Sequence, residues 1–136
     1  KESVFLKKNN KINYLGFLDR KKIQQTFSKS VAGIMVAHPM DNMLYSFPVK
    51  LFEYMSAGLP VIISNFPVWK AIIDKHQCGI CVEPTNVKEI SDAIQWIFDN
   101  PKKALEMGNR GKEATKKVYN WDIEESKLIS IYSNIK

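Results

Sequence analysis

The sequence has no long hydrophobic run. Its longest uninterrupted apolar stretch covers seven residues, 31–37, whereas a helix that spans a bilayer needs about 20. No charged segment followed by an apolar one opens the sequence, so it lacks the pattern of a secretory signal. From these absences we expect a cytoplasmic protein.

Arginine is scarce. Arg20 and Arg110 are the only two among 20 basic residues, and the formal net charge is +6. Proteins that read nucleic-acid bases prefer the forked donors of arginine, so we expect no nucleic-acid partner. The lysines gather in segments such as residues 101–118, which is typical of a solvated helix face. Such a surface leaves peripheral contact with the inner face of an anionic membrane open.

Cysteine is scarce as well, with one pair at Cys78 and Cys81. A zinc site needs four ligands, and His38 and His76 are the only histidines available to complete it. A redox pair of this spacing needs its first cysteine at a helix start, whereas residues 80–82 favour a buried strand. We interpret both cysteines as buried thiols, and we expect neither a metal nor a cofactor.

What remains is the composition of an ordinary folded domain, with 45% hydrophobic and 25% charged residues. Four short apolar runs bounded by turn residues are predicted to be strands, at residues 12–15, 33–37, 60–63 and 80–82. Because their apolar content is continuous, they suit a parallel sheet that is covered on both faces. We therefore predict an α/β fold with an open, mostly parallel, Rossmann-like sheet and helices on both faces.

Helix signals lie between the predicted strands. Asp19 is expected to cap a helix that reaches about residue 29. Ser46 is expected to open a second helix, which ends at Gly58, where a left-handed conformation is needed. A third helix is expected after Pro67.

The clearest helix signal is a capping box formed by Asn86 and Glu89. Its apolar stripe comprises Val87, Ile90, Ala93, Ile94, Ile97 and Phe98. Two helices without an intervening strand are predicted to follow, at about residues 102–118 and 122–135. Gly108 and Gly111 weaken the first of these by about 1 kcal/mol each relative to alanine, and we interpret them as allowing close packing.

The loop at residues 38–46 is the richest candidate for a ligand site. In open parallel sheets, ligands bind beyond the carboxyl ends of the strands, and this loop follows a strand and precedes a helix. The helix start offers backbone N–H groups and a positive dipole to an anion. Lys50 lies one turn further on, and a carboxylate at Glu53 on the same face suits the two hydroxyls of a ribose. The pattern predicts a nucleotide site.

Residues 46–64, SFPVKLFEYMSAGLPVIIS, closely resemble the donor-site signature of the group 1 glycosyltransferases, which are retaining enzymes of the two-domain GT-B class. Other landmarks of that family follow in the same order along the chain: Asn13-Tyr14-Leu15-Gly16-Phe17, Cys78-Gly79-Ile80-Cys81-Val82-Glu83-Pro84, Met107-Gly108 and Tyr119-Asn120-Trp121. The similarity thus covers nearly the whole sequence.

The resemblance implies the donor-binding domain of a hexosyltransferase-like enzyme. Such an enzyme moves a sugar from a nucleotide diphosphate sugar, of the UDP or GDP type, to a polysaccharide or lipid-linked acceptor. The pattern Ser-x-Pro-x-Lys is similar to that of bacterial transferases that build surface polysaccharides such as capsule or lipopolysaccharide. The expected donor-binding residues are Gly16, Phe17, Tyr45, Ser46, Phe47, Pro48, Val49, Lys50 and Glu53, while no catalytic residue is assigned.

Two positions depart from the family pattern. Tyr45 replaces the first of two glutamates, which in the family contacts the donor sugar, so the ribose role of Glu53 carries over and the sugar contact does not. Pro48 replaces a glycine whose N–H approaches the diphosphate, and proline has no N–H. These departures leave a second interpretation open, in which the domain keeps the fold as a non-catalytic binding or assembly module.

The sequence begins at Lys1 and contains none of the family's segments that precede this point. We interpret residues 1–136 as a single donor-binding domain, a fragment without the amino-terminal acceptor domain and without the first strand and helix of its own sheet. Its expected partner is therefore its own amino-terminal domain, and the fragment alone is expected to be inactive.

Overall fold

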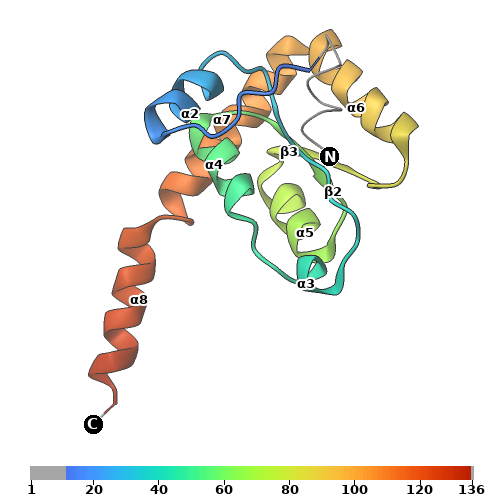
Figure 1. Ribbon diagram of the computed structural model, residues 1–136. Helices are drawn as coiled ribbons and strands as arrows, with labels where there is room; N and C mark the ends of the chain where they lie inside the picture. Colours follow the sequence, from blue (N-terminus) through green and yellow to red (C-terminus); the bar gives the residue numbers. More distant parts are fainter. Residues whose placement is uncertain (1–11, 136) are drawn as a thin grey trace.

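The computed structural model describes residues 12–135 (Figure 1). The strands in this range are β1 (Gly33–Met35), β2 (Val61–Ser64) and β3 (Gly79–Val82). The helices are α2 (Arg20–Phe27), α3 (Asp41–Leu44), α4 (Val49–Ala57), α5 (Pro67–His76), α6 (Val87–Asp99), α7 (Pro101–Lys117) and α8 (Trp121–Ser133). Strands and helices alternate up to α6, which confirms the predicted α/β class.

The strands form a parallel sheet in the order β1-β2-β3. Ile62 of the central strand lies beside Ile34 of β1 and Ile80 of β3. All four residues of β2 are buried, which agrees with the continuous apolar run that predicted this strand. The open edge of β1 pairs with no strand in residues 12–135.

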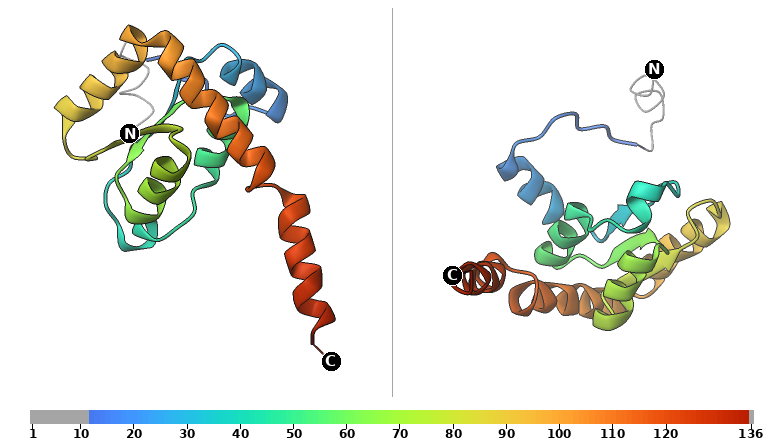
Figure 2. Two further views of the ribbon diagram at one scale, coloured as in Figure 1. Left: turned by 180° about the vertical axis from the view of Figure 1, so that it is seen from behind. Right: turned by 90° about the horizontal axis from the view of Figure 1, so that it is seen from below.

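Helices cover both faces of the sheet, as predicted (Figure 2). Val61 and Ile63 of β2 contact a cluster that includes Leu51 of α4 and Trp69 of α5. Ile62 points to the other face and packs in a second cluster with residues of α6. Helix α7 contributes Ala104 to the second cluster and Ala114 to the first, so it passes from one face to the other along the sheet.

The predicted strand at residues 12–15 is wrong. These residues form neither a strand nor a helix, and Ile12, Tyr14 and Leu15 are exposed. A strand needs a hydrogen-bonded neighbour, and no described strand pairs with this segment. Its apolar side chains therefore lie on the surface of the described part of the chain.

The predicted helix caps are mostly confirmed. Asp19 accepts a hydrogen bond from the Lys22 N–H at 2.8 Å, and Gly58 ends α4 in the left-handed conformation, with φ of 77°. Asn86 accepts from the Glu89 N–H. The expected opening at Ser46 is wrong, because α4 begins three residues later, after Pro48.

Ser46 is not a helix cap because its hydroxyl has another partner. It donates to the Met43 carbonyl at 3.2 Å and thereby closes the short helix α3. The predicted apolar stripe of α6 also needs correction at its two ends, since Val87 and Phe98 are exposed. Ala93 and Ile97 in its middle are buried as expected.

Gly108 and Gly111 let α7 pack closely, as interpreted from the sequence. A Cβ atom on Gly108 would clash with the Gly58 carbonyl oxygen at the end of α4. A Cβ on Gly111 would lie 3.3 Å from Met55 of α4 and 3.2 Å from Cys78. The backbones of α4 and α7 therefore meet directly, and this contact fixes how α4 sits against the sheet.

Helix α8 extends away from the rest of the molecule (Figure 1). None of its described residues is buried, and Trp121, Ile131 and Tyr132 are among its exposed apolar side chains. Both final helices were predicted, but α7 alone joins the core. No helix within residues 12–135 combines the length and the apolar character needed to cross a bilayer.

Both cysteines are free thiols that contact the same buried cluster. The strand alternation expected from the sequence does not separate them, because Cys78 lies one residue before β3 begins. Burial raises the pKa of each thiol to about 11. Thiols with a raised pKa are poor nucleophiles and metal ligands. The interpretation as buried thiols is confirmed for Cys78, whereas Cys81 is only half-buried.

Candidate functional site

The candidate loop at residues 38–46 is held at both ends by buried side chains. Ser64, at the end of β2, accepts a hydrogen bond from the Ala37 N–H at 2.9 Å and donates to the Ala37 carbonyl at 3.1 Å. Trp69 of α5 donates its indole N–H to the Ser46 carbonyl at 2.8 Å. Between these anchors, Met40 and Asp41 are exposed. The loop thus leaves the carboxyl end of β1 and reaches α4 along a defined path.

Helix α4 starts at this loop without a side-chain cap. Pro48 occupies the N-cap position in an extended conformation, with ψ of 121°. The first backbone N–H groups of the helix are those of Val49 and Lys50, and the Leu51 N–H is satisfied by the Pro48 carbonyl at 3.1 Å. Because the first N–H groups of a helix have no intrahelical partner, this end can accept an anion.

Lys50 and Glu53 are brought together in the first turns of α4. The Lys50 ammonium donates to a Glu53 carboxylate oxygen at 2.9 Å, and the two side chains are 54% and 40% exposed. This hydrogen bond raises the pKa of Lys50 above its usual value, and slight burial opposes the rise. An exposed pair of this kind stabilises the fold by at most about 1 kcal/mol. Both groups therefore remain available to a ligand at little energetic cost.

Glu53 also lines a pocket of about 440 Å³ between α2 and α4. Its lining mixes polar and apolar residues: Arg20, Ile23, Gln24, Phe27, Ser28, Glu53, Ser56 and Ala57. Phe27 of α2 contacts Tyr54 of α4 edge to face, with ring centroids 5.4 Å apart. This contact holds the two helices side by side, so a basic group and a carboxylate share one hollow.

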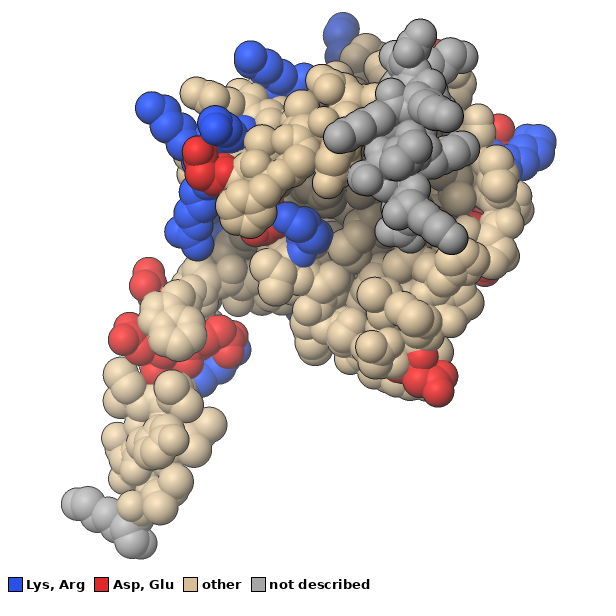
Figure 3. Space-filling view, in the orientation of Figure 1, with Lys and Arg blue, Asp and Glu red and all other residues tan. Residues whose placement is uncertain are grey.

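Sequence reasoning missed Arg20 and the other α2 residues in this pocket. The available signal was weak: Arg20 is one of two arginines, and it is the first residue of a capped helix. The sequence does not reveal that α2 packs against α4. Figure 3 shows basic side chains gathered over the part of the surface that α2 forms.

The other expected site residues do not form a compact group with Lys50 and Glu53. Tyr45, Phe47 and Val49 are exposed around the start of α4. Gly16 and Phe17 lie in the segment before α2; Gly16 has φ of 67°, and Phe17 is fully exposed. The structure therefore groups residues 45–53 in one region but does not pack Phe17 against them.

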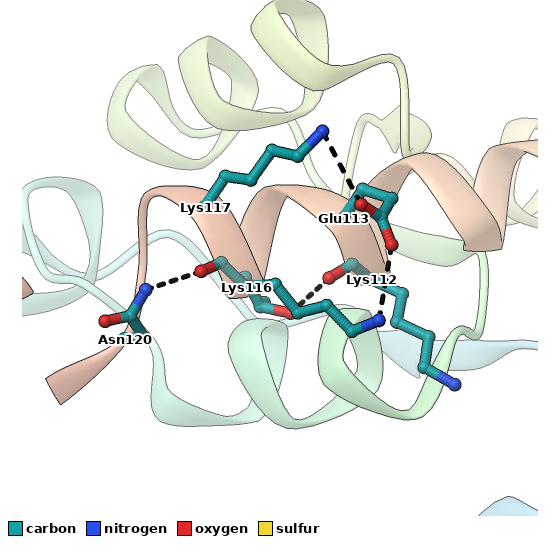
Figure 4. A network of polar contacts seen from close by, with 6 residues as sticks. Lys112, Glu113, Lys116, Lys117 and Asn120 are labelled. Atoms are coloured by element: carbon teal, nitrogen blue, oxygen red, sulfur yellow. Dashed lines mark hydrogen bonds and ion pairs between the residues drawn. The ribbon is translucent and has the colours of Figure 1, made fainter. Parts of the chain in front are cut away.

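A second polar cluster lies on the last turns of α7 (Figure 4). Glu113 pairs with Lys116 at 3.3 Å and with Lys117 at 3.6 Å. Asn120 donates to the Lys116 carbonyl at 2.6 Å and caps α8 through the Ile123 N–H. These contacts link neighbouring turns and join α7 to α8, so this cluster has a structural explanation.

Comparison with known proteins places these features in a family. The family model for glycosyl transferases group 1 matches residues 1–114. An MMP alpha-(1->4)-mannosyltransferase of Mycolicibacterium hassiacum is 21% identical over 63% of this chain and 21% of its own length. A D-rhamnosyltransferase of Pseudomonas aeruginosa is 23% identical over 79% of this chain and 28% of its own length.

A solved structure agrees with the fold. The sucrose-phosphate synthase of Thermosynechococcus elongatus superimposes with a TM-score of 0.84 at 19% identity, over 98% of this chain and 33% of that protein. This likeness supports the predicted α/β fold, which forms one half of the two-domain GT-B architecture. The chain spans less than a third of the length of the two relatives named above. Because the family model covers most of the sequence, the chain belongs to the group 1 glycosyltransferases.

Proposed function

We propose that this domain binds the nucleotide diphosphate part of a sugar donor at the start of α4. The observation that carries the proposal is the placement of Lys50 and Glu53 beside the uncapped helix start. The diphosphate would meet the first N–H groups of α4 and the Lys50 ammonium. Glu53 would give up its ion pair with Lys50. Its carboxylate would instead accept hydrogen bonds from the two ribose hydroxyls.

The nucleoside of a UDP or GDP type donor would extend from Glu53 into the pocket between α2 and α4. That pocket has room for part of a small ligand, at about 440 Å³, and typical ligand sites measure about 300 to 1,000 Å³. Gly16 and Phe17 belong to the segment that precedes α2, and this segment would cover the nucleoside. Tyr45, Ser46, Phe47, Pro48 and Val49 would surround the diphosphate and the sugar.

In the proposed reaction, the bond between the anomeric carbon and the diphosphate oxygen breaks, and its electron pair leaves with the diphosphate. An acceptor hydroxyl oxygen bonds to the same face of the anomeric carbon, and its proton passes to the diphosphate. Negative charge grows on the leaving group, so Lys50 and the α4 amides would stabilise the transition state electrostatically. The acceptor would be a polysaccharide or a lipid-linked sugar, as in capsule or lipopolysaccharide synthesis on the cytoplasmic side of a bacterial membrane.

The proposed enzyme needs more than this domain. We infer that the intact protein also has an amino-terminal acceptor domain and one more strand and helix beside β1. The open edge of β1 among the described residues and the 33% coverage of sucrose-phosphate synthase support this. The mass of the native protein, measured by mass spectrometry, tests it. A native chain of 136 residues would contradict the inference.

Calorimetric titration of the intact protein with UDP, GDP and their sugars tests the donor site. Glu53→Gln and Lys50→Ala should each weaken binding by roughly 10-fold to 100-fold, because each removes a charge-assisted hydrogen bond. The matched control is Lys70→Ala, since Lys70 also forms an exposed helical ion pair, 2.8 Å from Asp74. Unchanged binding and turnover in both α4 variants would show that the site is wrong.

The alternative function is a non-catalytic binding or assembly module. Tyr45 favours it, because it stands where the family has the glutamate that contacts the donor sugar. Binding and turnover of the intact protein, measured together, distinguish the two functions. A module would bind a nucleotide or a partner without transferring sugar in the intact protein, whereas an enzyme would release the diphosphate in the presence of acceptor.

A further inference from the structure

Helix α2 presents two rows of side chains to the pocket that it shares with α4. Arg20, Gln24 and Ser28 are spaced four residues apart and form an exposed polar row, while Ile23 and Phe27 form a half-buried apolar row beside it. Residues four apart lie on one face of a helix, so each row runs along α2. A flat aromatic ligand can rest on the apolar row and offer its polar edge to the polar row.

The facing wall of the pocket, which comes from α4, offers few further groups to an aromatic ring. It consists of Glu53, Ser56 and Ala57, and the Ser56 hydroxyl already donates to the Glu53 carbonyl at 2.9 Å. Glu53 is the one carboxylate among the described residues that line the pocket, and the proposed function uses it for the ribose. A base in this pocket must therefore be recognised mainly from α2.

Arg20 is the side chain of α2 that is best able to recognise a base. Within residues 12–135 it forms no ion pair. The neighbouring Asp19 carboxylate is engaged by Lys22, whose N–H lies at 2.8 Å and whose ammonium lies at 3.6 Å. The other arginine differs, because Arg110 donates its Nε–H to the Gln77 carbonyl at 2.8 Å. The Arg20 guanidinium thus keeps its planar fork of donors for a ligand.

The fork of an arginine distinguishes the bases of the two donor types. Guanine carries two adjacent acceptors, O6 and N7, which match two parallel N–H groups of a guanidinium. The two carbonyl oxygens of uracil are separated by a ring N–H, so a fork directed at that edge meets a donor between them. Adenine places an amino donor beside its N7 acceptor. Guanine is therefore the base that an unpaired arginine in this pocket fits best.

We propose that Arg20 recognises guanine and that the donor of this domain is a GDP sugar. The inference rests on the proposed function, because it needs the diphosphate at the start of α4 and the ribose on Glu53. Guanine would then lie against Ile23 and Phe27, with its O6 and N7 atoms toward the Arg20 guanidinium. A uracil in the same place would leave part of the fork without an acceptor, which disfavours a UDP sugar.

Calorimetric titration of the intact protein with GDP and UDP tests the inference. GDP should bind about 5-fold to 150-fold more tightly than UDP, which corresponds to about 1 to 3 kcal/mol for one bidentate contact. Arg20→Lys keeps the charge but loses the fork, so it should lower the affinity for GDP to near that for UDP and change the affinity for UDP by less than about twofold. Equal affinities in the parent protein, or a preference for GDP that survives in Arg20→Lys, would overturn the inference.

A matched pair of variants separates recognition of the base from general attraction of an anion. Arg20→Gln and Lys21→Gln remove the same charge from the same turn of α2, but Lys21 does not line the pocket. Arg20→Gln should abolish the preference for GDP, whereas Lys21→Gln should keep it. Thermal unfolding checks that both exposed changes leave the fold intact. An equal loss of preference in the two variants would assign it to charge alone and contradict the inference.

Two analogues of GDP identify the edge of guanine that the protein contacts. 7-Deaza-GDP has a C–H group in place of N7, and its affinity should be about 5-fold or more below that of GDP. IDP lacks the exocyclic amino group and should bind within about twofold of GDP. In Arg20→Lys, GDP and 7-deaza-GDP should bind alike, because the loss of N7 and the loss of the fork remove the same contact. Weak binding of IDP with normal binding of 7-deaza-GDP would place the opposite edge of guanine against the protein and overturn the inference.

The α4 variants separate this inference from the proposed function. Glu53→Gln and Lys50→Ala should weaken GDP and UDP binding alike, since ribose and diphosphate are common to both nucleotides, whereas Arg20→Lys should weaken GDP binding alone. Loss of binding in the α4 variants with equal affinities for GDP and UDP in the parent protein would keep the donor site and remove the recognition of guanine. Absence of binding to any nucleotide would remove the donor site and, with it, this inference.

Discussion

Residues 46–50 and residues 51–64 belong to one continuous motif, yet they have opposite surroundings. In the first part, Phe47 and Val49 are exposed, and Lys50 pairs with Glu53 across the surface of α4. In the second part, Leu51, Met55 and every residue of β2 are buried, while Glu53 keeps a side chain that is 40% exposed and belongs with the exposed part. The boundary between them falls inside the first turn of α4, where Val49 is 72% exposed and Leu51 is 0% exposed.

This difference indicates that the motif has two roles, packing of the core and binding of a ligand. The buried part holds α4 between the sheet and α7, and its changes should act on stability. The exposed part contributes little to packing, so its changes should act on ligand binding. The free energy of unfolding of the buried variants, and the affinity for nucleotide of variants at the site, test whether this division is as sharp as burial indicates.

Leu51→Ala should have the largest effect on stability. Leu51 is fully buried against the sheet, and truncating such a side chain costs about 2 to 5 kcal/mol. Its control is Val49→Ala, two residues earlier on the same helix, which should change the unfolding free energy by less than about 0.5 kcal/mol. Denaturant unfolding monitored by circular dichroism measures both. Similar losses of stability in the two variants would contradict the boundary between exposed and buried residues within α4.

Gly108→Ala should come next, with a loss of about 1 to 3 kcal/mol from overpacking. The added Cβ would clash with the Gly58 carbonyl, which is backbone and moves little. Gly111→Ala places its Cβ 3.2 Å from its nearest neighbour and should cost less. Thermal unfolding orders the two variants, and a more stable Gly108→Ala protein would contradict the close approach of α4 and α7.

The sequence predicted the buried part of the fold well because burial leaves a local pattern. Continuous apolar runs marked β1, β2 and β3, and Gly58 and Asn86 marked helix ends. It misplaced the start of α4, because the Ser46 hydroxyl bonds back to Met43, and a serine in sequence does not show which partner it takes. The prediction of a strand at residues 12–15 was wrong because a strand needs a neighbouring strand to pair with, and a local sequence pattern does not show whether one is present.

The candidate site was predictable only in part for the same reason. Lys50 and Glu53 lie three residues apart on one helix, so helical spacing alone predicts their contact. Arg20 reaches the Glu53 pocket through the packing of Phe27 on Tyr54, a contact between segments far apart in the sequence. The pocket between α2 and α4 could therefore not be inferred from spacing.

Ser64→Ala should cost about 1 to 3 kcal/mol, since it removes the buried hydroxyl that pairs with the half-buried Ala37 N–H. The same change should also weaken nucleotide binding, because Ser64 anchors the loop that leads to α4. Its control is Ser56→Ala, whose exposed hydroxyl bonds to the Glu53 carbonyl within the helix. A stability loss without any change in affinity would show that the loop is held by Trp69 alone.

Acid should weaken the fold modestly through His76. Its ring nitrogen lies 3.1 Å from the Tyr119 hydroxyl, and burial, followed by the charge of Lys75, lowers the pKa of His76. The unfolded chain therefore binds a proton more readily than the folded one, and stability falls as pH drops below about 6.5. His76→Gln should flatten this part of the stability profile. An unchanged profile in the variant would assign the acid sensitivity to other groups.

Lys50→Ala should have the smallest effect on stability and a large effect on ligand binding. Its ion pair with Glu53 is exposed, so its loss should cost less than about 1 kcal/mol. Affinity for a nucleotide diphosphate should nevertheless fall roughly 10-fold or more, because the ammonium would directly face the diphosphate charge. Unfolding and titration on one preparation compare the two losses. If Lys50→Ala lost as much stability as Leu51→Ala while keeping its affinity, the exposed part of the motif would be structural, and the donor site would have to lie elsewhere.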